Sequence, residues 1–157
     1  MPISACIITF NEADRIGDCL ASLSFCNEIV VVDSGSTDRT VELSRAAGAR
    51  VTVMSDWPGF GPQKNRALDL ATGAWVLSLD ADEWVTPALA AEIRAAVQRT
   101  DAPAGFELPR LSSFVGREMR HSGWWPDYIT RLFRRGSARF SDDLVHERLV
   151  VNGAVGR

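Results

Sequence analysis

Two carboxylates separated by a single residue are the sharpest chemical signal in this chain of 157 residues. Asp80-Ala81-Asp82 comes directly after the apolar run 74–79. Two carboxylates so placed can converge on a hard divalent cation, Mg²⁺ or Mn²⁺, which prefers oxygen ligands. Such a cation would bridge a diphosphate and stabilise the charge that develops on it as a leaving group. An isolated motif of this kind can also be a solvated acidic turn, but its place behind an apolar strand favours the functional interpretation.

A second carboxylate, Asp33, ends the valine-rich run 28–33. It could accept hydrogen bonds from a base N–H or a ribose hydroxyl, while residues 34–37 present backbone N–H groups at a helix start. Capping of the following helix explains the same residues equally well. Asp33 is therefore a candidate ligand of a nucleotide, with a purely structural role as the alternative.

Two cations stand in the first turn of the helix expected between Pro62 and Gly73. Lys64 and Arg66 occupy the end of the helix dipole that disfavours positive charge, unless an anion lies nearby. The sequence therefore indicates an anionic ligand at this helix start. The alternative is an ordinary solvated helix face.

The segment 121–127 combines adjacent tryptophans with an acidic residue. Trp124 and Trp125 could wall a sugar or cover a diphosphate, and burial beside their rings would raise the pKa of Asp127 and suit it to proton abstraction. Arg131 and Arg134, a few residues later, could pair with phosphates, as could Arg135. A surface loop whose tryptophans pack on the sheet is the alternative.

The elements that must position these residues follow from the apolar pattern. We expect strands over 3–9, 28–33, 50–54 and 74–79. The intervening helices would be capped by Asn11, by Ser36 or Thr37, and by Thr86 before Pro87, and Gly48 would end the second. The pattern predicts an α/β fold with a mostly parallel sheet flanked by helices and a less regular C-terminal part after residue 99. Ligands of such sheets bind at the carboxyl ends of the strands. No glycine-rich fingerprint follows these strands, which disfavours a dinucleotide or P-loop site.

Composition bounds the function further. With 46% hydrophobic and 24% charged residues, the chain is an ordinary globular sequence of one-domain length. It contains no apolar run of membrane-spanning length and no leader pattern, so a cytoplasmic location is expected. The three cysteines do not form a disulfide or zinc pattern and are expected to be reduced. Residues 101–157 are mildly basic and could meet an anionic acceptor or the inner face of a membrane, with scattered solvated arginines as the alternative. No nucleic-acid partner is expected.

Together these motifs resemble the family 2 glycosyltransferases of the GT-A (Rossmann-like) fold, and most closely the bacterial lipopolysaccharide-core β-glucosyltransferases. The resemblance covers essentially the whole chain as a single domain, with a nucleotide-sugar-binding half over 1–99 and an acceptor-binding and base-bearing half over 100–157. The motifs that carry it are Thr9-Phe10-Asn11-Glu12, the segment 32–38, Gln63-Lys64-Asn65-Arg66, Asp80-Ala81-Asp82-Glu83, the segment 123–134 and Val145-His146-Glu147.

The resemblance implies a role for each matching residue. Asn11, Glu12 and Asp33 would hold the uridine of a donor, with Asp80 and Asp82 binding the metal and diphosphate. The wider substrate-binding set would add Thr9, Ser34, Gly35, Lys64, Arg66, Ala81, Trp124, Trp125, Arg131 and Arg134. Asp127 would be the catalytic base and His146 a further metal ligand. Many members have a Glu before the base where this chain has Pro126, so Glu147 is an alternative base.

The implied reaction is a single displacement that inverts the anomeric centre, with Mn²⁺ or Mg²⁺ as cofactor. A hexose, glucose first, would pass from a UDP-sugar to a hydroxyl of a glycan or of a lipid-linked acceptor such as lipopolysaccharide core. Family members continue beyond this length, so the chain is expected to be a truncated form with incomplete activity. A non-catalytic nucleotide-sugar-binding domain remains the main alternative. A haloacid dehalogenase-like phosphatase is disfavoured because its Asp motif normally stands on the first strand.

Overall fold

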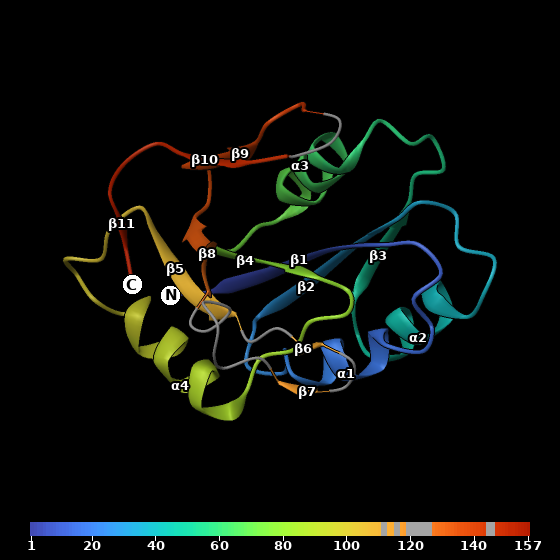
Figure 1. The fold of residues 1–157 in the computed structure, drawn as a ribbon, viewed down its shortest axis with the longest axis horizontal. Coiled ribbons are helices and arrows are strands. Elements are labelled where there is room, and N and C mark those ends of the chain that lie inside the picture. Colours follow the sequence, from blue (N-terminus) through green and yellow to red (C-terminus); the bar gives the residue numbers. More distant parts are fainter. Residues whose placement is uncertain (111–112, 115–116, 119–126, 144–146) are drawn as a thin grey trace.

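A twisted seven-stranded sheet forms the centre of the computed structural model, within the part of the chain that it describes (Figure 1). The described residues are 1–110, 113–114, 117–118, 127–143 and 147–157. The strand order is β11-β5-β8-β4-β1-β2-β3, and two short two-stranded ladders, β9 with β10 and β6 with β7, lie outside the sheet. The predicted α/β class with a mostly parallel sheet is confirmed.

The elements have the following bounds. The strands are β1 Ile3–Thr9, β2 Glu28–Asp33, β3 Arg50–Val53, β4 Trp75–Asp80, β5 Gly105–Arg110, β6 Ser113–Phe114, β7 Arg117–Glu118, β8 Asp127–Arg134, β9 Ala138–Phe140, β10 Leu149–Val151 and β11 Val155–Gly156. The helices are α1 Ile16–Ala21, α2 Thr40–Ala46, α3 Phe60–Leu70 and α4 Pro87–Ala96.

Strand direction decides which residues meet at the functional edge of the sheet. β1 pairs in parallel with both β2 and β4, and β2 pairs in parallel with β3. β8 lies between β4 and β5 and is antiparallel to both. The first residue of β8, Asp127, is therefore opposite Arg110, the last residue of β5. The start of β8 and the ends of the parallel strands share one edge.

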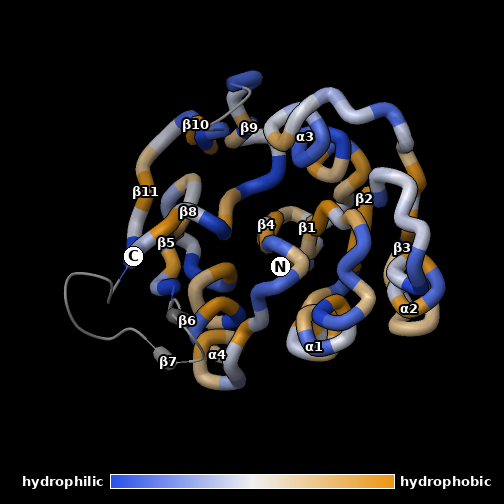
Figure 2. Tube along the Cα trace, turned by 45° about the vertical axis from the view of Figure 1, so that its right-hand side comes forward, coloured by the Kyte–Doolittle hydropathy of each residue, from blue (hydrophilic) through white to orange (hydrophobic). Residues whose placement is uncertain are grey.

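Helices cover both faces of the sheet. The alternation of β1 sends Ile3, Ala5 and Ile7 to one face, where the side chains of α1 and α4 complete a buried core. Cys6 points to the other face, where a second core forms against α3. Figure 1 shows α1, α2 and α4 on one side of the sheet and α3 with the β9–β10 hairpin on the other. Figure 2 shows hydrophobic residues recurring along α1, α4 and the central strands.

Two of the predicted helix starts are wrong, and one is confirmed. α1 begins at Ile16, with no side-chain cap, because Asn11 bonds elsewhere. α2 begins at Thr40, with Arg39 and not Ser36 or Thr37 at the N-cap and no side-chain cap, and the backbone N–H of Thr40 donates to the Asp38 carboxylate. α4 starts as predicted, with the Thr86 hydroxyl accepting from the N–H of Leu89 at 3.2 Å.

Gly48 ends α2 with a φ of 89°, a left-handed conformation that favours glycine. All three cysteines are free, which confirms the prediction that they do not pair. In the part of the chain that the structure describes, no helix has the length and apolar character needed to cross a membrane.

Candidate functional site

Asp33 shapes the loop at the carboxyl end of β2. Its side chain is fully buried and accepts four hydrogen bonds. The hydroxyls of Thr9 and Ser36 donate to one carboxylate oxygen at 2.7 and 2.6 Å, and the backbone N–H groups of Gly35 and Ser36 donate to the other at 2.9 and 2.7 Å. Direct contact with a base or ribose would need one of these donors to give way.

Asn11 ties the end of β1 to the same loop. It has a φ of 51°, an uncommon left-handed conformation for a residue other than glycine. Its amide oxygen accepts from the N–H of Thr37 at 2.8 Å, and its own N–H donates to Ser36 at 2.8 Å. The backbone N–H of the next residue, Glu12, donates to the Thr40 hydroxyl at 2.9 Å. The ends of β1 and β2 therefore form one cross-linked loop pair.

Asp80 lies between two cations at the carboxyl end of β4. The Lys64 ammonium is 3.5 Å from one carboxylate oxygen, and the Arg131 guanidinium is 3.4 Å from the other. Both cationic side chains are only 11% exposed, whereas that of Asp80 is 41% exposed. Burial raises the pKa of Asp80, but the charges of Lys64 and Arg131 outweigh it and hold that pKa below its usual value.

Glu83 closes the turn after β4 and was not among the predicted site residues. Its carboxylate accepts from the N–H of Asp80 at 2.8 Å and lies 3.1 Å from the Arg131 guanidinium. Burial raises its pKa, and the Arg131 charge opposes that effect. Ala81, inside this turn, is buried.

Asp82 points from this turn toward the β1 loop. Its side chain is 50% exposed, and Arg15 lies 3.4 Å from it. The same arginine is 3.5 Å from Glu12. Arg15 thus links the two loops at this edge of the sheet, a role that no local pattern indicated.

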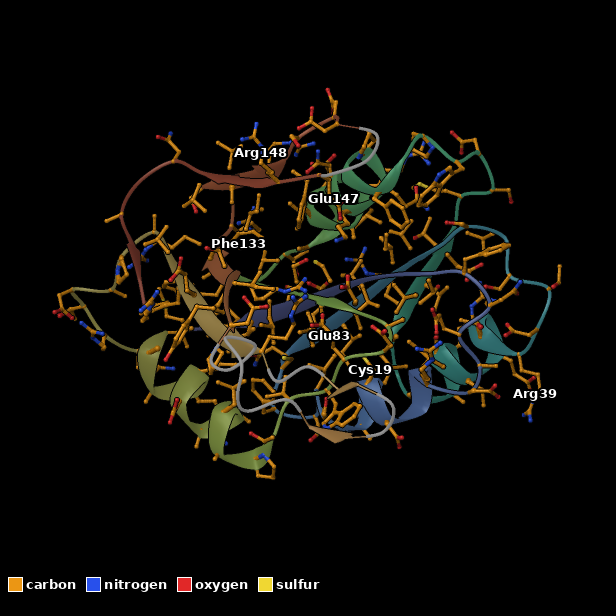
Figure 3. All side chains as sticks on the ribbon, viewed as in Figure 1. Cys19, Arg39, Glu83, Phe133, Glu147 and Arg148 are labelled. Atoms are coloured by element: carbon orange, nitrogen blue, oxygen red, sulfur yellow. The ribbon has the colours of Figure 1, made fainter. Side chains whose placement is uncertain are left out.

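α3 makes the second connection across the edge. The buried Gln63 amide donates to the Ser34 hydroxyl at 3.1 Å. The next residue, Lys64, donates to Glu147 at 3.0 Å and stands 5.0 Å above the ring of Phe140. Figure 3 labels Glu147 beside α3 and Glu83 near the loop that follows β4. Lys64 was predicted near the donor, and its partners Glu147 and Phe140 come from a distant segment.

Two predicted residues, Arg66 and Arg134, lie apart from the Asp80 group. The Arg66 guanidinium binds Asp56 at 2.6 Å, in the loop ahead of α3. Arg134 lies opposite Trp75, at the other end of β4, where its guanidinium stacks 4.7 Å over the indole and donates to the carbonyl of Ala102. The predicted pairing of Arg134 with phosphates does not match this position.

Asp127 lies on the functional edge but differs from its predicted environment. Its carboxylate is 40% exposed and forms an ion pair with Arg110 at 2.7 Å. The other predicted members of this part of the site, Trp124, Trp125 and His146, lie outside the described residues. Within the described ranges, no three His, Cys, Asp or Glu side chains gather as a metal-binding group.

The site that remains combines open carboxylates with sheltered cations. Asp80 and Asp82 offer oxygen atoms to a hard cation, while Lys64 and Arg131 offer N–H groups to an anion. The β1 and β2 loops lie beside this group along the edge, joined to it by Arg15. Such an edge can hold a ligand that is polar at one end and highly anionic at the other.

Comparisons with known proteins agree with this geometry. The family described as Glycosyl transferase family 2 matches residues 4–149. The chain is 36% identical over 166 residues to the lipopolysaccharide core biosynthesis glycosyltransferase LpsC of Rhizobium meliloti, covering 99% of this chain and 60% of LpsC. It thus spans less than two thirds of that relative.

Solved structures show the same fold. Residues 1–349 of Staphylococcus aureus TarS superpose with a TM-score of 0.70 and 24% identity, covering 92% of this chain and 51% of that one. TarS 1–349 in complex with UDP-GlcNAc gives a TM-score of 0.66 and 25% identity, covering 86% and 46%. The predicted GT-A fold is confirmed, and the chain belongs to the family 2 glycosyltransferases.

Proposed function

We propose that this chain is the donor-binding part of an inverting glycosyltransferase that transfers a hexose from a UDP-sugar to a hydroxyl. The placement of Asp80 carries the proposal: it lies at the end of a central parallel strand, partly open to solvent, between two sheltered cations. The complex of TarS with UDP-GlcNAc supports a nucleotide-sugar donor. The similarity to LpsC, a lipopolysaccharide core biosynthesis glycosyltransferase, supports lipopolysaccharide core as the acceptor. We further propose that the protein works at the inner face of a membrane.

The local charge supports dependence on a divalent cation. Lys64 and Arg131 stand against three carboxylates, those of Asp80, Glu83 and Glu147. When all three are ionised, the group is negative and repels an incoming diphosphate. A divalent cation reverses that sign, because a bound ion is the largest local charge in such a site.

The residues present fit Mn²⁺ or Mg²⁺. Asp80 and Asp82 provide carboxylate oxygens, and both side chains are about half exposed. Mg²⁺ in proteins is usually held by one or two carboxylates together with substrate phosphates and water, so two protein ligands suffice. Bound there, the ion would supply neutralisation of the diphosphate leaving group.

The chain's own residues would then divide the work. The β1–β2 loops would hold the nucleoside, and Lys64 and Arg131 would orient the diphosphate through charge-assisted hydrogen bonds. Asp127 would take the proton of the acceptor hydroxyl as it attacks the anomeric carbon. Displacement from the face opposite the diphosphate would convert an α-linked donor into a β-linked product.

Thermal unfolding with UDP tests the donor site. We expect UDP to raise the melting temperature more with Mn²⁺ than without it, because a ligand that binds only the folded state stabilises it. Asp82→Ala should remove the Mn²⁺-dependent part of the shift. A matched control is Asp101→Ala, since Asp101 is exposed and pairs only with Arg99 among the described contacts. An equal shift in Asp82→Ala and the unsubstituted chain would place the metal elsewhere.

A further inference from the structure

We propose that Glu147 is a positioning residue that shares the Lys64 ammonium with Asp80, so that Lys64 does not pair fully with Asp80 and Asp80 stays available to a divalent cation. The proposal rests on the proposed function, in which Asp80 and Asp82 bind that cation. It assigns a task to the β9–β10 hairpin, whose connecting segment carries Glu147.

The distances around the Lys64 ammonium are unequal. Its nitrogen lies 3.0 Å from the Glu147 carboxylate, a hydrogen-bonding distance, and 3.5 Å from that of Asp80. The shorter contact goes to the residue that is more enclosed, since the Glu147 side chain is 20% exposed and that of Asp80 is 41% exposed. Lys64 is thereby drawn toward the hairpin, and Asp80 keeps an open side.

Loss of the Glu147 charge would redirect Lys64. The Lys64 side chain is only 11% exposed. Its ammonium therefore needs a counter-charge, because an unpaired buried charge is costly. Asp80 is the other carboxylate within ion-pair distance of Lys64 among the described residues. A closer Lys64–Asp80 pair than the present 3.5 Å contact would occupy the oxygen that the cation needs. The Lys64 ammonium and the divalent cation would then compete for the Asp80 carboxylate.

The hairpin is fixed firmly enough to aim Glu147. Asn65 donates to the carbonyl of Phe140 at 2.9 Å and accepts from its N–H at 2.8 Å, so one side chain satisfies both backbone groups. The carbonyl of Ser141 approaches Gly61 so closely that a Cβ there would lie 1.9 Å from its oxygen. Ser141 in turn accepts from the N–H of Arg148 at 2.9 Å, which closes the segment beside Glu147.

Calorimetric titration of the full chain with Mn²⁺ alone tests this role. Glu147→Gln keeps the size of the side chain but removes its charge, and we expect roughly ten-fold weaker Mn²⁺ binding, the usual scale for a residue that acts through a metal ligand. Adding Lys64→Met should restore most of the affinity, because the competing ammonium is gone. Lys64→Met alone should bind Mn²⁺ at least as tightly as the unsubstituted chain.

Glu107→Gln is the matched control, because Glu107 pairs with Arg157 at 2.9 Å and not with the Asp80 group. Its Mn²⁺ affinity should be unchanged. Unchanged binding in Glu147→Gln, or a double variant as weak as Glu147→Gln, overturns the positioning role while leaving the metal site intact. If Asp82→Ala binds Mn²⁺ like the unsubstituted chain, the metal site itself fails and the role of Glu147 fails with it.

Discussion

At the scale of single residues, one acidic side chain can serve either architecture or chemistry, and its neighbours decide which. The fully buried carboxylate of Asp33 accepts hydrogen bonds from four donors of the protein itself. Asp80 meets its cations at longer distances and keeps part of its surface open. Both follow apolar strands, so their sequence contexts look alike. Only the partners brought by the fold separate them.

The identity of the catalytic base is tested by two substitutions. Asp127→Asn should lower turnover by roughly a hundred- to ten-thousand-fold, the usual range for a general base, and leave Mn²⁺ and UDP affinity nearly unchanged. Glu147→Gln should weaken Mn²⁺ binding and recover its turnover at saturating Mn²⁺. Both are compared by steady-state kinetics in the longest active form of the protein. Retained turnover in Asp127→Asn, with an unrecoverable loss in Glu147→Gln, would make Glu147 the base.

Glu28 gives the fold a specific acid sensitivity. Burial raises its pKa, but hydrogen bonds from Ser4, Thr72 and Arg50 outweigh that effect and lower the pKa to about 2. Since the pKa in the folded state lies below the ordinary glutamate value of 4.5, the stabilisation by Glu28 is complete above about pH 4.5 and is lost as the pH falls toward 2.

Denaturant unfolding at several pH values checks this. Glu28→Gln should be less stable than the unsubstituted chain at pH 7, and the difference should shrink between about pH 4.5 and 2. Glu42→Gln serves as the control, since the Glu42 side chain is 67% exposed and its pair with Arg39 lies on the surface. A gap between the two curves that does not change with pH would contradict the assignment.

At the scale of elements, local patterns predicted what local forces decide. The apolar run 74–79 correctly predicted β4, and Thr86 before Pro87 correctly predicted the start of α4, because both signals act within a few residues. Asn11 misled the prediction because its amide serves a loop 26 positions away. The pair of Lys64 with Glu147 spans 83 positions, so no spacing rule could indicate it. Much of the site is built from such distant pairs.

Two glycines test how tightly α3 and the hairpin pack. Gly61→Ala should destabilise the fold by about 1–3 kcal/mol, because its Cβ would meet the backbone of Ser141. Gly17→Ala, in α1, should stabilise by about 0.5–1 kcal/mol, because nothing lies within 4 Å of its Cβ and alanine favours helix. Thermal unfolding of both variants measures this contrast. Equal changes in stability for Gly61→Ala and Gly17→Ala would mean that the β9–β10 hairpin moves aside from α3 at little cost.

At the scale of the whole molecule, the two parts of the chain share one sheet. β5, β8 and β11 come from residues after 100, yet they extend the sheet that β1 to β4 begin. The core follows the same rule: Trp75 of β4 is fully buried and packs against Phe106 of β5, with ring centroids 5.8 Å apart. The expected boundary at residue 99 therefore does not mark two separately folded parts. It marks two proposed roles, donor binding and acceptor binding, within one sheet.

The antiparallel insertion of β8 also imposes an order on biosynthesis. β4 is complete when Asp80 leaves the ribosome, but the strand that covers its outer edge ends only at Arg134. At about 5–20 residues per second, the nascent chain carries a central strand with one unpaired edge for several seconds, since β4 can pair only with β1 until β8 is made. β5 emerges within that interval and has no place beside β4 until β8 arrives between them. Translation speed through this stretch, and chaperones that shield a bare strand edge, thus become determinants of how much protein reaches the native state.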